Sequence, residues 1–165
     1  MKVKFLAMTL AMAAAMFTMS CSSSDDDGIT PVEDYDIIVG KWESPVPAPI
    51  FGGLISSIDV EFRNNQTYTV ISHNADGSTT TLEGTYSTGN GVNGIRTIYL
   101  EQSSPTSLVS EGIYQITDND TKMSYEVVQT EPDLGFAPPT PEAGFGSTGG
   151  GALDDMNVQQ YIRVE

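Results

Sequence analysis

The chain is short and strongly acidic. It has 165 residues, of which 22 are Asp or Glu and 7 are Lys or Arg, so its formal net charge is −15. A field of this sign repels nucleic acid phosphates, which argues against nucleic-acid binding. The length predicts one domain once an N-terminal targeting segment is set aside.

Residues 1–20 are expected to be a signal peptide. A positive N-terminal region precedes the apolar run Phe5 to Met19, which is too short to span a bilayer as a finished helix. The run ends at Ser20 and Cys21, and Cys21 is the one cysteine of the chain, with no partner for a disulfide. We therefore predict cleavage before Cys21 and its acylation, with palmitate as a typical chain, so that the lipid bilayer is a partner. The alternative is an ordinary secreted protein with an unmodified cysteine.

Residues 21–36 are expected to form a lipidated acidic tether. The segment is polar, contains Pro31 and has no hydrophobic period, so it has little to bury. Its serine run followed by aspartates resembles the surface-export signal of certain bacterial lipoproteins, which implies an outer-membrane location at the cell surface. The alternative is a solvated spacer. The residues of this signal are Ser22, Ser23, Ser24, Asp25, Asp26 and Asp27.

Residues 37–165 have the pattern of an all-β domain. Short runs alternate apolar and polar residues, as in Ile58, Val60 and Phe62, and Gly, Asn, Asp or Pro separate the runs. Short connections favour hairpins between neighbours, so we predict an eight-stranded antiparallel up-and-down barrel, either filled by side chains or holding one small ligand. The expected strands lie near 37–44, 54–63, 67–73, 79–87, 95–102, 108–117, 121–130 and 158–165.

Two short motifs carry a family resemblance. The first expected strand contains Gly40-Lys41-Trp42 and the last contains Tyr161-Ile162-Arg163, and this pairing resembles the lipocalin and lipocalin-like families. The run Gly84-Thr85-Tyr86 is similar to the bacterial lipocalin-like lipoproteins. The resemblance implies a closed-end structural pair in which Arg163 packs over Trp42, as a guanidinium stacks on an indole. The alternative is plain core packing of Trp42 with Arg163 exposed.

The sequence has no strong motif for catalysis, cofactor binding or metal binding. The Gly-x-Gly-x-x-Gly run at 144–149 lacks the strand before it and the helix after it, so we expect a mobile loop rather than a nucleotide site. His73 is the one histidine, and we expect no metal, no cofactor and no catalytic residues. The loop from Asp118 has Met123 and Gln129 where an EF-hand needs Gly and Glu, so calcium is not expected.

The connections after the first, third, fifth and seventh expected strands share one end of an up-and-down barrel, and two of them are long. These connections are 45–53, 74–78, 103–107 and 131–157; the other end has the shorter 64–66, 88–94 and 118–120. We expect Ile50, Phe51, Phe136 and Phe145 in the long connections to contact a ligand or partner, because long loops in a compact domain usually have a use. The alternative is that these side chains plug the barrel.

The leading hypothesis is a monomeric, non-catalytic binding module that captures a small apolar or amphipathic molecule. The competing hypothesis is an interaction or structural lipoprotein with a filled barrel, which docks a protein or glycan through its long loops. Tyr68, Tyr86, Tyr114 and Tyr125 have enough bulk to fill a small barrel, and this favours the second hypothesis.

Overall fold

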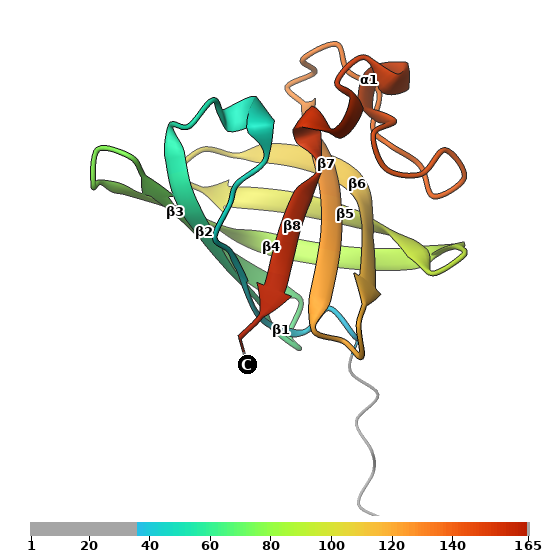
Figure 1. The fold of residues 1–165 in the computed structure, drawn as a ribbon, viewed down its shortest axis with the longest axis horizontal. Coiled ribbons are helices and arrows are strands. Elements are labelled where there is room, and N and C mark those ends of the chain that lie inside the picture. The colour runs from blue at the N-terminus through green and yellow to red at the C-terminus, as the bar shows by residue number, and fades with distance from the viewer. Residues whose placement is uncertain (1–35, 165) are drawn as a thin grey trace, which may run out of the picture. The chain divides into compact units, whose positions relative to one another are not determined.

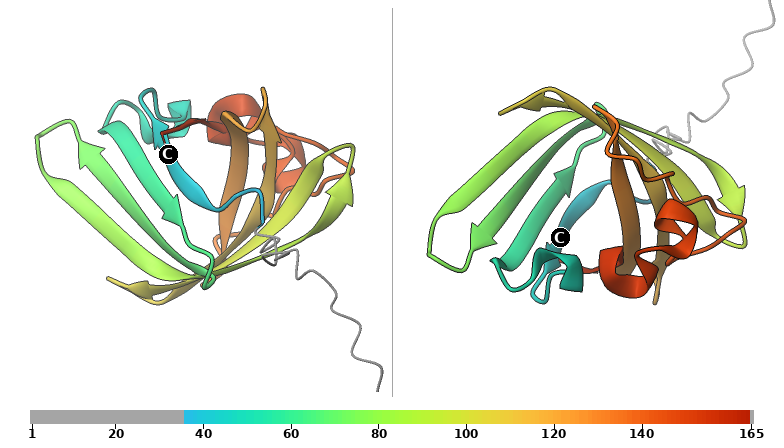
Figure 2. Two further views of the ribbon diagram at one scale, coloured as in Figure 1. Left: turned by 90° about the horizontal axis from the view of Figure 1, so that it is seen from below. Right: turned by 90° about the horizontal axis from the view of Figure 1, so that it is seen from above.

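The computed structural model describes residues 36–164, which form a closed barrel of eight strands (Figures 1 and 2). The prediction of an eight-stranded antiparallel up-and-down barrel is confirmed. The strands are β1 Gly40–Ser44, β2 Ile55–Phe62, β3 Thr67–Asn74, β4 Thr79–Val92, β5 Ile95–Ser104, β6 Leu108–Thr117, β7 Lys122–Glu131 and β8 Gln159–Arg163.

Every strand pairs antiparallel with its neighbour in sequence, and β8 pairs with β1 to close the ring. At this seam Trp42 lies opposite Arg163 and Glu43 opposite Ile162. The seam is short compared with β6–β7, where the register runs from Val109 to Thr117. The ring therefore closes through its shortest strands.

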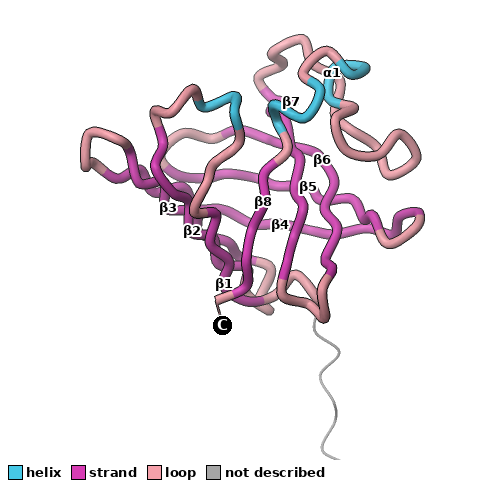
Figure 3. Tube along the Cα trace, in the orientation of Figure 1, coloured by secondary structure: helices cyan, strands magenta, loops and turns pink. Residues whose placement is uncertain are grey.

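The two ends of the barrel differ in how they are covered. The β1–β2 connection, which contains the 3₁₀ helix η1 (Pro49–Phe51), and the long β7–β8 connection cover the end that we call the mouth (Figures 1 and 3). The β7–β8 connection contains α1 (Thr148–Gly151) and η2 (Asp154–Asn157). The start of β1 and the end of β8 lie at the opposite end, which we call the closed end.

Side chains fill the closed half of the barrel. Alternation along β2 turns Val60 and Phe62 inward, where the Phe62 ring meets the edge of the Tyr86 ring with 5.0 Å between centroids. The buried cluster also contains Ile38, Trp42, Ile98, Tyr114 and Met123. The packed core thus lies near the chain's entry into the domain.

Two strand boundaries differ from the sequence prediction by more than two residues. Strand β1 begins at Gly40 rather than at residue 37, because Ile38 leaves the ladder in a turn and is fully buried in the core. Strand β4 continues to Val92 rather than ending at 87, because its polar and glycine-rich end still pairs with β5. Gly91 lets the two strands meet there, since a Cβ on it would lie 1.6 Å from the Ile95 carbonyl oxygen.

Candidate functional site

The mouth half of the barrel is hollow. A cavity of about 540 Å³ opens there, a size typical of small-molecule sites. Most of its lining is apolar, and none of the described residues that line it is Asp, Glu, Lys, Arg or His. The apolar lining comprises Ile50, Phe51, Ile55, Ile58, Val70, Leu82, Leu100, Leu108, Val127, Val128, Leu134, Phe136 and Leu153.

The alternating pattern of the strands builds this lining. Along β3, Tyr68, Val70 and Ser72 face the cavity while the residues between them face outward. In β2 a bulge between Ile55 and Ser57 breaks the alternation. The bulge turns Ile55 into the cavity together with Ile58, where strict alternation would have placed Ser56.

Three glutamines at the rim hold the mouth loops. Gln102 donates from Nε2 to the Thr106 carbonyl at 2.8 Å, and Gln129 donates to the Pro132 carbonyl at 2.7 Å. The Oε1 of Gln159 accepts a hydrogen bond from the Ala48 amide at 2.8 Å. Each glutamine lines the cavity and ties one loop to its own strand end or to a neighbouring strand. The Nε2 groups of Gln102 and Gln129 and the Oε1 of Gln159 are therefore engaged within the protein.

Three tyrosines in the cavity wall have free hydroxyls. Tyr68, Tyr125 and Tyr161 all line the cavity, and among residues 36–164 the tyrosine hydroxyls that have a hydrogen-bond partner are those of Tyr86 and Tyr114. No fully buried side-chain oxygen or nitrogen in this part of the chain lacks a partner, so the three cavity hydroxyls are accessible from the cavity. Burial raises the pKa of Tyr68 to about 12 and also raises the pKa of Tyr125 and Tyr161. The phenols therefore keep their protons at neutral pH and are able to donate.

The structure places three of the four residues expected to contact a ligand in this cavity. Ile50 and Phe51 reach it from η1, and Phe136 reaches it from the β7–β8 connection. Phe145 is half-buried in the same connection but is not part of the lining. The sequence indicates that Tyr68 and Tyr125 have the bulk to fill the barrel. Alternation predicts that they point inward, but it carries no information on the space left beside them.

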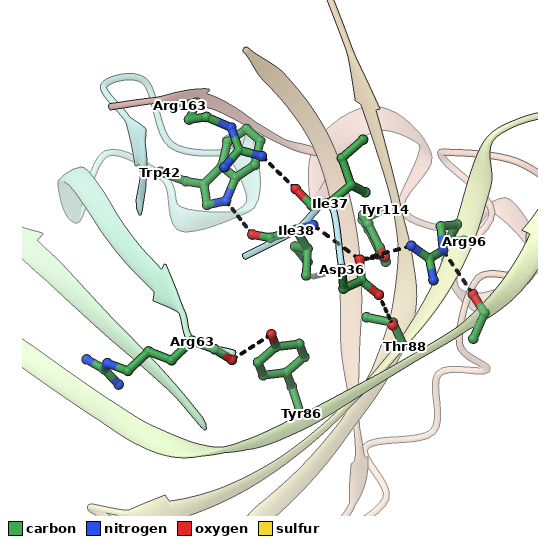
Figure 4. Close-up of polar contacts among 11 residues, drawn as sticks. Asp36, Ile37, Ile38, Trp42, Arg63, Tyr86, Thr88, Arg96, Tyr114 and Arg163 are labelled. Carbon is green, nitrogen blue, oxygen red and sulfur yellow. Dashed lines mark hydrogen bonds and ion pairs between the residues drawn. The ribbon is translucent and has the colours of Figure 1, made fainter. Parts of the chain in front are cut away.

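At the closed end, Arg163 and Trp42 are in contact (Figure 4). The guanidinium carbon of Arg163 lies 4.0 Å from the centre of the Trp42 ring. The guanidinium also donates to the carbonyls of Val39 at 2.7 Å, Ile37 at 2.6 Å and Asp120 at 2.6 Å, and Trp42 donates from Nε1 to the Ile38 carbonyl at 2.8 Å. The pair therefore holds the segment before β1 against the barrel.

Asp36 anchors the same segment. This residue ends the expected tether, yet its Oδ1 accepts hydrogen bonds from Arg96 at 2.9 Å and Tyr114 at 3.1 Å, and its Oδ2 accepts one from Thr88 (Figure 4). Burial alone raises the pKa of Asp36, but these hydrogen bonds and the charge of Arg96 outweigh it and leave the pKa below the usual value. Asp36 thus belongs to the barrel and remains ionised.

A buried glutamate fastens the β7–β8 connection to the outside of the barrel. Glu126 is 0% exposed and accepts hydrogen bonds from the amides of Gly146 at 2.7 Å and Thr148 at 3.0 Å, and from the Thr148 hydroxyl. The amides of the Gly-x-Gly-x-x-Gly run at 144–149 thus surround a carboxylate of the chain itself. Alternation along β7 by itself would place Glu126 on the wet outer face with Ser124. The loop that buries Glu126 follows much later in the chain.

The other expected features are placed as follows. His73 Nε2 lies 2.8 Å from Asp59 Oδ2 on the outer surface, and no group of acidic, His or Cys side chains in residues 36–164 is arranged to hold a metal ion. Within the same residues no helix has the length and apolar character needed to cross a membrane. The expected signal peptide, Cys21 and the export signal Ser22 to Asp27 lie outside the described residues.

Comparison with known proteins gives no relative: no protein-family model, no curated protein and no solved structure matches the chain.

Proposed function

We propose that the barrel binds one small apolar or amphipathic molecule in its interior without transforming it. The observation that carries this proposal is the open cavity of about 540 Å³ with a mostly apolar wall. Transfer of an apolar ligand from water into such a wall is favourable in proportion to the area buried. The described part of the wall has no carboxylate or imidazole for acid–base chemistry, which supports binding rather than turnover.

The location that we propose is the cell surface, with the protein held in the outer membrane as a lipocalin-like lipoprotein. The support is in the sequence: an apolar leader, Cys21 directly after it, and the acidic run that resembles an export signal. The contact between Trp42 and Arg163 is the one that the lipocalin-like resemblance implies. The chain enters the barrel at Asp36, at the closed end, so the proposed tether is attached at the end opposite the mouth.

A second candidate function is docking of a protein or glycan through the mouth loops. The observation that favours it is a set of exposed apolar side chains at the mouth: Val46 is 77% exposed, Leu54 75% and Leu134 59%. Apolar groups gathered at one end are typical of interaction sites. The two functions differ in whether the cavity itself has to be open.

The test fills the cavity and measures binding of N-phenyl-1-naphthylamine, a neutral probe that fluoresces in apolar sites. Val70→Trp places an indole in the cavity, whereas Ile71→Trp places one on the outer face of the same strand and is the matched control. We expect Val70→Trp to weaken probe binding at least tenfold with little change in melting temperature, and Ile71→Trp to bind as the wild type does.

A filled barrel gives the opposite result. Extra volume in a packed core costs about 1–3 kcal/mol of stability. A destabilised Val70→Trp variant, together with a wild type that does not bind the probe, would reject the cavity as the functional site and leave docking through the loops.

A further inference from the structure

The three tyrosines with free hydroxyls lie close together in the cavity wall. Tyr68 is 3% exposed and Tyr161 6% exposed, so both side chains are largely enclosed by the barrel. The rings of Tyr125 and Tyr161 meet edge to face at 5.9 Å between centroids. The Phe62 ring lies near both Tyr68 and Tyr125, with 6.3 Å between its centroid and that of Tyr68 and 6.5 Å to that of Tyr125. The three tyrosine rings therefore belong to one aromatic cluster in the cavity wall.

Unpaired hydroxyls in such a place favour a ligand that accepts hydrogen bonds. A ligand that enters the cavity removes water from these hydroxyls, which is unfavourable unless the ligand replaces the lost hydrogen bonds. A phenol that keeps its proton donates readily to a carbonyl, ether or hydroxyl oxygen. The glutamines of the wall are weaker candidates for this role, because the Nε2 groups of Gln102, Gln129 and Gln159 already donate within the protein.

The same wall offers nothing to balance a negative charge. No Lys, Arg or His is among the described lining residues. A carboxylate that enters an apolar site gives up its hydration, and neutral hydroxyls replace only part of it.

The charges around the mouth also disfavour an anionic ligand. Within residues 36–164 every lysine and arginine lies at the closed end: Lys41 near the start of β1, Arg63 after β2, Arg96 at the start of β5, Lys122 at the start of β7 and Arg163 at the end of β8. The charged residues of the mouth connections are all acids: Asp76, Asp133, Glu142, Asp154 and Asp155, with Glu131 at the end of β7 beside them. Asp133 and Asp154 are next to Leu134 and Leu153, which line the cavity.

From the wall and the rim together we infer that the cavity selects uncharged molecules with an apolar body and a hydrogen-bond acceptor, and that it rejects anions such as fatty-acid carboxylates. This inference rests on the proposed function, because it assumes that the cavity binds a small molecule. Tyr68, Tyr125 and Tyr161 give the preference for an acceptor, and the acidic rim together with the uncharged wall gives the rejection of anions.

The test compares three ligands on one scaffold with the full-length protein: naphthalene, its neutral ketone 2-acetylnaphthalene, and the anion 2-naphthoate. Each competes with bound N-phenyl-1-naphthylamine. We expect the ketone to bind about threefold to tenfold more tightly than naphthalene, which is the range of one net hydrogen bond. We expect the naphthoate to bind at least tenfold more weakly than the ketone.

Two sets of variants test the contributions of the tyrosines in the wall and of the acids at the rim separately. Changing Tyr68, Tyr125 and Tyr161 to Phe removes only unpaired oxygens and should abolish the advantage of the ketone while naphthalene binding persists. Asp133→Asn with Asp154→Asn should raise naphthoate affinity about twofold to threefold and reduce its salt dependence, because rim charges within a Debye length of about 10 Å act on the ligand. The control is Asp118→Asn with Asp120→Asn, which removes the same charge at the closed end and should change nothing.

The outcomes distinguish the two proposals. If the wild type binds none of the three ligands and not the probe, the proposed function fails. If it binds them without preference, or binds the naphthoate as tightly as the ketone, the cavity is a binding site but the inferred selectivity is wrong. If the preference for the ketone persists after the three Phe substitutions, the tyrosine hydroxyls are not its cause.

Discussion

Replacing Arg163 should loosen the closed end of the barrel as a unit. The guanidinium covers the Trp42 ring and donates to the carbonyls of Ile37, Val39 and Asp120, which come from two separate segments. Arg163→Ala removes these contacts together. The seam between β1 and β8 has two paired positions, and the Val164 amide also donates to the Lys41 carbonyl and the Gln159 side chain to Ser44. The Arg163 contacts are therefore a large part of what closes the ring at this end.

The magnitude follows from the contacts. Hydrogen bonds from a charged donor contribute about 1.5–3 kcal/mol when buried, and we take about 0.5–1 kcal/mol for each of the three because the site is partly exposed. A cation over an indole adds about 0.5–2 kcal/mol. We therefore expect Arg163→Ala to lower the free energy of unfolding by about 2–5 kcal/mol, and Trp42→Ala, a fully buried truncation, by about 3–5 kcal/mol.

The assay is a double-mutant cycle by urea denaturation, followed by circular dichroism because Trp42 is the one tryptophan. The double variant should lose about 1–2 kcal/mol less than the two single losses added together. Arg163→Lys should recover little, since an ammonium does not reproduce the planar fork. Additive losses, or a Lys variant as stable as the wild type, would refute the stacked pair.

Three further predictions concern the sequence before the barrel and the fastened loop. Cys21→Ser should abolish labelling by a fatty-acid analogue and release the protein from the membrane fraction; label on the Ser variant would contradict acylation at this residue. Changing Asp25, Asp26 and Asp27 to Ala should leave acylation intact and reduce protease accessibility on whole cells, whereas unchanged accessibility would make the acids a spacer. Glu126→Gln should cost about 1–3 kcal/mol and speed hydrogen exchange at the Gly146 and Thr148 amides, because an amide group gives one acceptor oxygen where the carboxylate gives two; the outward Ser124→Ala is the control, and unchanged exchange would show that the loop is held by other contacts.

Most of the barrel could be predicted from the sequence because its signals are local. Alternation such as that of Ile58, Val60 and Phe62 sets the inward face, and turn residues between short runs allow only hairpins between neighbours. The two boundary errors arise where local signals mislead. The apolar residues 37–39 have the composition of a strand, but Ile38 is buried in the core at the closed end instead of pairing in the sheet. The end of β4 pairs with β5 although its sequence has no hydrophobic alternation.

The candidate site was less predictable because it depends on contacts between distant segments. Apolar residues in long loops indicated Ile50, Phe51 and Phe136, but space beside Tyr68 and Tyr161 depends on the volumes of all eight strands together. The burial of Glu126 depends on a loop twenty residues further along the chain. A single sequence carries no local sign of either feature.

The seam between β1 and β8 also sets an order of assembly. Arg163 bonds to Val39 across a sequence separation of 124 residues, while every other strand pair joins neighbours. Hairpins of neighbours form early because their loops are short, and a contact this remote forms after them. Until β8 docks, β1 and β7 each present an unpaired edge that is prone to join another chain. A newly made barrel is therefore most exposed to aggregation in the interval before its last short strand completes the ring.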